Sequence, residues 1–257
     1  MEPYETYLNI SSRAKRLLHI HDGLINIRRK GIRKDWKRNF CKIMHWPISS
    51  DIERIDSKEA IIVLRAGAKL KREDFEKEII EDLLRSAITF GVSALDRYVH
   101  ERVVKNIIAA LSGGELSKHQ RNLEIPAHLA LKSVRKMSKT KGKGKNVRPA
   151  NDIRNEIQEV LHARPYQGWL QIVNAFKLIG ISELKDKIGK YYSSSEKQEI
   201  ESTLDNIVIR RNYIVHEGDL KRHQRGGNIK MHELSRKEVE DSLNFIDKLV
   251  RNLDKFR

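Results

Sequence analysis

The sequence predicts an all-α fold, and three observations lead to that prediction. Apolar residues recur at steps of three and four over long stretches, which is the period of a helix with one buried face. Two segments open with serine and carry a glutamate three residues later, a pattern typical of capped helix starts. The alternation expected of a half-buried strand is convincing nowhere, although Glu59 to Arg65 could form one short strand.

The first long pattern runs from Arg72 to Leu111. It predicts one very long helix or two consecutive helices, with Gly91 as the break between them. Shorter patterns predict further helices at Pro126 to Met137, Asn151 to His162, Trp169 to Ile179 and Glu183 to Tyr191.

Two capped helices are predicted in the C-terminal part of the chain. One begins at Ser193 and ends at Gly218, because glycine commonly terminates helices. The other begins at Ser235 with Glu238 as its capping partner. Its apolar stripe consists of Val239, Leu243, Ile246, Val250 and Leu253.

Composition indicates a basic protein that binds a polyanion. The 257 residues include 51 Lys and Arg against 35 Asp and Glu, a formal charge of +16. Nucleic acid is the first candidate partner, and acidic membrane surfaces are the weaker one. No uncharged apolar run reaches the roughly 18 residues of a membrane span, so we expect no membrane partner. A single cysteine, Cys41, and a polar start without a secretory signal predict a cytoplasmic location.

Basic residues gather first between Arg13 and Lys42, interleaved with Trp36, Phe40 and the nearby Trp46. The strip could contact phosphates and stack on unpaired bases of RNA or DNA. Equally, it could be a small packed subdomain whose rings are core. The candidates for RNA contact here are Arg28, Arg29 and Lys30. We place a basic, aromatic-containing extension over residues 1–50 and a helical domain over residues 51–257.

A second basic cluster lies between Lys132 and Arg148 and contains no acidic residue. We expect a poorly ordered loop near residues 138–148 that grips the RNA backbone, with a plain solubilising loop as the alternative. The candidate RNA-binding residues are Lys132, Arg135, Lys136, Lys139, Lys141, Lys143, Lys145 and Arg148.

The candidate catalytic residues are Arg211, Asn212 and His216, near the end of the helix that starts at Ser193. Arg211 falls within the apolar side of that helix, where an arginine must be paired or functional. Asn212 and His216 are four residues apart and share a face. Arginine can hold phosphate oxygens in two contacts, and histidine titrates near neutrality as a proton carrier needs to.

The segment from Ile209 to Asp219 resembles the signature of HEPN-domain ribonucleases, in which arginine, a polar residue, three further residues and histidine follow one another. The similarity is to the RiboL-PSP group and extends over Ser57 to Phe256. It implies an α-helical bundle that works as a homodimer, with two motif copies facing a shared cleft. It also implies RNA cleavage without a metal or other cofactor through attack by the 2′-hydroxyl. A toxin or phage-defence role, with an antitoxin or defence-system partner protein, is implied as well.

The resemblance also assigns roles within the motif. Arg211 would stabilise the scissile phosphate, Asn212 would orient it and His216 would move a proton. Arg210 could replace Arg211 and is a further candidate for RNA contact.

Other interpretations of the motif remain open. Arg211 could be a structural arginine paired with a carboxylate such as Asp96 or Glu101. The domain could instead bind RNA without cutting it, or serve as an interaction module. The remaining histidines, of which His19, His21, His223 and His232 come closest to a pair pattern, are expected to be surface residues rather than metal ligands.

Overall fold

The computed structural model describes residues 2–25, 28–29, 31–57, 59–65, 67–113, 118–121, 155, 157–161, 164–221 and 230–256. Its helices are α1 Pro3–Leu24, α2 Lys34–Ile43, α3 Lys77–Gly113, α4 Lys118–Arg121, α7 Trp169–Leu178, α8 Leu184–Gly189, α9 Ser194–Glu217 and α10 Arg236–Asp254. A 3-10 turn, η1 Arg72–Phe75, precedes α3. The strands are β1 Arg28–Arg29, β2 Ile52–Asp56 and β3 Ile61–Arg65. The described part of the chain is thus mainly helical, as predicted.

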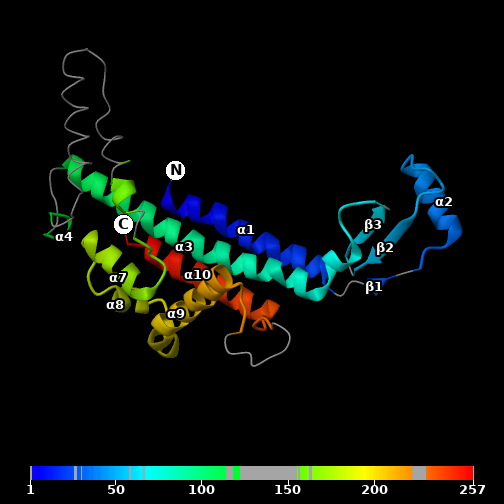
Figure 1. Cartoon of the computed structure of the whole chain (residues 1–257). Helices are drawn as coiled ribbons and strands as arrows, with labels where there is room; N and C mark the ends of the chain where they lie inside the picture. Colours follow the sequence, from blue (N-terminus) through cyan, green and yellow to red (C-terminus); the bar gives the residue numbers. More distant parts are fainter. Residues whose placement is uncertain are drawn as a thin grey trace, which may run out of the picture.

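The long helix α3 is the centre of the bundle. α1 and α10 run alongside it, and α7 and α9 also pack against it (Figure 1). α3 continues through Gly91 as one helix. A Cβ added at this position would collide with the Leu243 side chain of α10. The glycine therefore permits close helix packing and does not divide the helix, so the single long helix is the correct alternative.

The first helix shares the core of the bundle. Tyr7, Ala14 and Leu18 lie on one face of α1 and are almost fully buried in the same cluster as the core residues of α3 and α10. The Tyr7 hydroxyl donates a hydrogen bond to the buried Asp247 of α10, and burial, the largest cause, together with this bond raises the pKa of Tyr7. Helix α1, which lies within the basic extension expected over residues 1–50, thus packs in the core of the bundle. The basic residues between its buried positions hide this amphipathic stripe in the sequence.

A three-stranded antiparallel sheet of order β1-β2-β3 lies with α2 beyond one end of the α1 and α3 pair (Figure 1). β3 falls within the short strand suggested for Glu59 to Arg65. β2 was not predicted, because its apolar residues Ile52 and Ile55 are three positions apart and disguise the period of two.

The remaining helix predictions agree with the structure where it describes them. α7, α8, α9 and α10 lie within a residue or two of the predicted bounds. Residues 155 and 157–161 are helical, as expected for the later part of the Asn151 to His162 pattern. The helix predicted at Pro126 to Met137 and the basic loop near 138–148 lie outside the described residues. Within the described chain, no helix has the length and apolarity of a membrane span.

Candidate active site

The helix that carries the motif, α9, is defined at both ends. At its start the Ser193 hydroxyl accepts a hydrogen bond from the Glu196 amide at 3.3 Å, and the Glu196 carboxylate accepts one from the Ser193 amide at 2.8 Å. Hydrogen bonds from the Lys248 ammonium and from Ser193 lower the pKa of Glu196 to about 2. At its end Gly218 adopts the left-handed conformation with φ 61°. The predicted catalytic residues therefore lie on the last two turns of a fixed helix.

Arg211 is half-buried and is not paired with a carboxylate of the described chain. Its Nη1 donates to the Asn212 Oδ1 at 2.9 Å, while its buried Nε has no partner among the described residues. The two acidic residues that could have held it are engaged elsewhere. Asp96 accepts from the Tyr166 amide at 2.6 Å, and Glu101 accepts from another arginine of α3. The guanidinium of Arg211 thus retains hydrogen-bonding capacity next to the Asn212 amide.

The neighbouring Arg210 has a different environment. Its Nη2 donates to the Asp219 Oδ2 at 2.8 Å, and Arg85 of α3 donates to the same oxygen through Nε, also at 2.8 Å. The Asp219 side chain is fully buried, and that of Arg85 is 6% exposed. Arg210, which was predicted to contact RNA, is therefore held by an internal carboxylate. Of the two adjacent arginines, Arg210 is ion-paired, and Arg211 has no carboxylate partner among the described residues.

Backbone hydrogen bonds around Asp219 fix the turn that follows α9. The amides of Gly218 and Asp219 both donate to the Tyr213 carbonyl, and the His232 amide donates to the Asp219 carbonyl. The Tyr213 and His232 rings stack with centroids 5.6 Å apart and an interplanar angle of 6°. His232 is consequently part of the packing around the motif. Arg85 and Asp219 were missed as site residues, and the only sequence signal for Asp219 is its place directly after the terminal glycine.

His216 is exposed at the end of α9, and Asn212 is half-buried. A cleft of about 460 Å³ lies between α3 and this helix end. Thr89 and Phe90 of α3 line one side of it, and Ile214 and Gly218 from the motif segment line the other. The cleft therefore adjoins the motif. Residues next to the candidate catalytic residues line it, and Arg211 and His216 themselves do not.

The aromatic residues of the basic N-terminal segment pack against one another. Trp36 and Phe40 stack with centroids 4.9 Å apart, and Phe40 meets Trp46 edge-on at 5.6 Å. Arginines of the sheet cover the rings, with the Arg54 guanidinium 5.0 Å from the Trp36 ring centre. This arrangement favours the packed subdomain over a surface of rings open to bases. The backbone of Arg28 and Arg29 forms β1, and Lys30 lies outside the described residues.

The other predicted contacts are placed only in part. The basic candidates between Lys132 and Arg148 and the histidine at 223 fall outside the described residues. His19 is exposed as expected. His21 of α1, expected at the surface, is 1% exposed with its Nδ1 3.2 Å from Asp22, so that prediction was wrong. The burial follows from the position of His21 in the same stripe as Ala14 and Leu18, which the basic composition obscures.

A helical bundle with arginine, asparagine and histidine on the last turns of one capped helix is the arrangement of a HEPN-type domain. The family model of RiboL-PSP-HEPN matches residues 50–256, which is most of the chain, so the protein belongs to this family. The resemblance drawn from the motif is thereby confirmed. No curated protein and no solved structure matches the chain significantly. Membership indicates an RNA-related function, since HEPN domains commonly bind RNA and many are ribonucleases.

Proposed function

We propose that this protein is an endoribonuclease that cleaves RNA without a metal ion, through attack by the 2′-hydroxyl. The observation that supports the proposal is the different state of two adjacent arginines. Arg210 is ion-paired with Asp219, whereas Arg211 has no carboxylate partner among the described residues and lies beside Asn212, which is one helical turn before His216. Because Asp219 pairs with Arg210 and not with Arg211, we assign the contact with the RNA phosphate to Arg211.

The reaction assigns one task to each residue. The 2′-oxygen forms a bond to phosphorus, and the bond between phosphorus and the 5′-oxygen breaks. One proton leaves the 2′-hydroxyl and another reaches the departing oxygen, giving a cyclic phosphate and a 5′-hydroxyl end. Arg211 would neutralise charge on the phosphate oxygens, Asn212 would orient them and His216 would carry a proton. RNA is required because DNA lacks the nucleophile.

The proposal includes a homodimer whose cleft brings two motifs together. Phe90 of α3 lines the cleft and is 36% exposed, and Val215 of α9, next to the lining residue Ile214, is 46% exposed. Apolar side chains exposed around a polar motif are typical of a surface that a second copy covers. The partner subunit's His216 would then carry the second proton. Light scattering of the purified protein tests the dimer.

Cleavage of labelled RNA in excess EDTA tests the activity. His216→Ala should abolish cleavage and leave the helical content and RNA affinity unchanged, whereas the matched control His19→Ala, at an exposed position of α1, should cut like the original protein. A substrate with a 2′-deoxy nucleotide at the cut site should resist. Full activity of His216→Ala would remove the catalytic assignment.

A non-catalytic RNA-binding or interaction module is the alternative outcome of the same assay. It predicts a mobility shift that weakens with salt and no cut product. For the ribonuclease we further propose a cytoplasmic toxin or phage-defence role with a neutralising partner protein. Growth arrest on expression of the original chain, absent for His216→Ala, would support that role, and equal growth of both strains would contradict it.

A further inference from the structure

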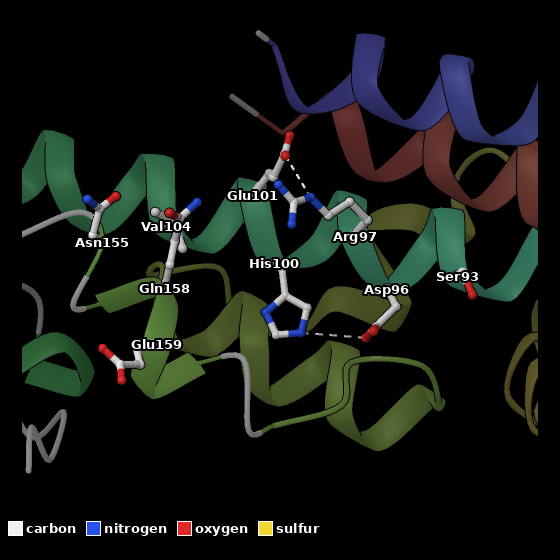
Figure 2. A pocket seen from close by; sticks show the side chains of 9 residues that line it. All are labelled: Ser93, Asp96, Arg97, His100, Glu101, Val104, Asn155, Gln158 and Glu159. Carbon is white, nitrogen blue, oxygen red and sulfur yellow. Dashed lines mark hydrogen bonds and ion pairs between the residues drawn. The ribbon is translucent and has the colours of Figure 1, made fainter. Parts of the chain in front are cut away.

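A second cleft beside α3, distinct from the one at the motif, has an acidic lining. It measures about 570 Å³ and is bounded by α3 and by the helical residues around 155–161 (Figure 2). Asp96, Glu101 and Glu159 contribute carboxylates to it, and the arginine among the lining residues, Arg97, donates to Glu101 at 2.8 Å. A phosphate would meet net negative charge there. RNA that extends beyond the motif therefore needs a different surface.

Helix α2 has the opposite charge on its exposed face. Lys34, Arg38 and Lys42 follow one another at steps of four residues and are all exposed, so they form one row along the helix, which we call the basic row. The row spans about 12 Å, with about 6 Å for each step. None of its three cations forms an ion pair within the described part of the chain. The exposed Asp35 is the acidic residue of α2, and three cations against one carboxylate leave this face positive.

The opposite face of α2 holds the basic row in place. Trp36 and Phe40 stack on each other, and Phe40 meets Trp46 edge-on. The sheet covers these rings, because the guanidinium groups of Arg54 and Arg65 lie 5.0 Å and 5.3 Å from the ring centres of Trp36 and Trp46. The three rings are thus half-buried and packed within the subdomain. Contact with a nucleic acid at α2 therefore depends on the cations and not on stacking.

A surface that offers cations without stacking rings favours the backbone of paired RNA over an unpaired strand. A duplex carries about twice the charge of a single strand for the same length of axis, and its bases are turned inward. We infer that the basic row of α2 is a docking surface for the phosphate backbone of a paired RNA stem. α2 lies outside the family match over residues 50–256, so this surface adds to what the family domain supplies. The inference rests on the proposed ribonuclease function and adds its substrate class, a structured RNA.

Fluorescence anisotropy of a labelled hairpin RNA tests the surface, with the full chain carrying His216→Ala so that the RNA stays intact. Lys34→Gln, Arg38→Gln and Lys42→Gln together should weaken binding roughly a hundredfold at about 0.1 M salt, since three phosphate contacts are lost. The slope of log Kd against log salt concentration should fall by about 2–3. The three positions are exposed, so circular dichroism should show an unchanged helical content.

The matched control removes the same charge from other parts of the surface. Lys105, Lys185 and Lys197 are each paired with a carboxylate. Replacing all three by Gln should weaken binding far less than the basic-row substitutions do. Equal weakening by both sets would show that total charge alone matters and would overturn the inference. Equal affinity of the unsubstituted row for the hairpin and for an unstructured strand of the same length would also overturn it.

Two further outcomes separate this inference from its alternatives. With His216 restored, the basic-row variant should cut the hairpin more slowly at limiting protein concentration. Unchanged binding and cutting would refute the docking surface and leave the ribonuclease intact, whereas row-dependent binding by a protein that never cuts would refute the ribonuclease and leave the surface. If the substitutions abolish binding to phosphatidylserine vesicles and leave RNA binding unchanged, the row is a membrane surface and the inference is refuted.

Discussion

Replacing Asp219 by Asn should destabilise the protein strongly. The substitution keeps the shape of the side chain and removes its charge, which leaves Arg85 and Arg210 without the carboxylate to which both donate at 2.8 Å. Removing one partner of a buried ion pair typically costs about 3–5 kcal/mol. Arg85 retains a contact with Asp82 at 3.2 Å, so we expect the lower end, about 3 kcal/mol. That is a large share of the roughly 5–15 kcal/mol that stabilises a typical domain.

Urea denaturation followed by circular dichroism measures this effect. With a slope of about 3 kcal/mol per molar urea, the midpoint should fall by about 1 M. The matched control is Asp186→Asn, because Asp186 is 74% exposed and forms a surface pair with Lys197 at 2.9 Å. Such a pair contributes only about 0–1 kcal/mol. Equal losses in the two variants would refute the claim that the buried cluster fixes the end of α9.

Three further predictions concern the bundle. Gly91→Val should cost about 1–3 kcal/mol, because the added side chain meets the α10 side chain packed there, and thermal denaturation would measure it. Leu18→Ala should lower the free energy of unfolding by about 2–5 kcal/mol, whereas Ile20→Ala, at a side chain that is 43% exposed, should change it little. Equal losses in urea denaturation would contradict the packing of α1 in the core. The lowered pKa of Glu196 gives stability that is present above its unfolded value of about 4.3 and is lost as pH falls through about 2. Glu196→Gln should therefore unfold with a shallower dependence on pH over that window, and an unchanged acid profile would contradict the bond to Lys248.

The helices were predictable because their signals are local. Ser193 and Ser235 both cap as expected, each with the glutamate three residues on, and Gly218 ends α9 in the left-handed conformation. Such caps depend on hydrogen bonds within one turn, so their residue types alone reveal them. β2 escaped prediction because its burial comes from neighbouring strands and does not follow a simple alternation along its own sequence.

The motif shows the same division at the level of the site. Its helix, its position near the helix end and its family were evident from the residues between Ile209 and Asp219. Which of the two arginines is available was not evident. Arg85 lies 134 residues before Asp219, and nothing in the local sequence of either residue announces their contact.

The sequence by itself determined the helical class, the caps of α9 and α10, the family and the residue types of the motif, because each depends on neighbours within one or two helical turns. Only the tertiary structure decided that α1 joins the core, that Gly91 is a packing position and that Asp219 forms its ion pair with Arg210 and not with Arg211. The physical reason is that burial and charge pairing depend on distances between helices remote in sequence, and these distances exist only once the bundle has packed.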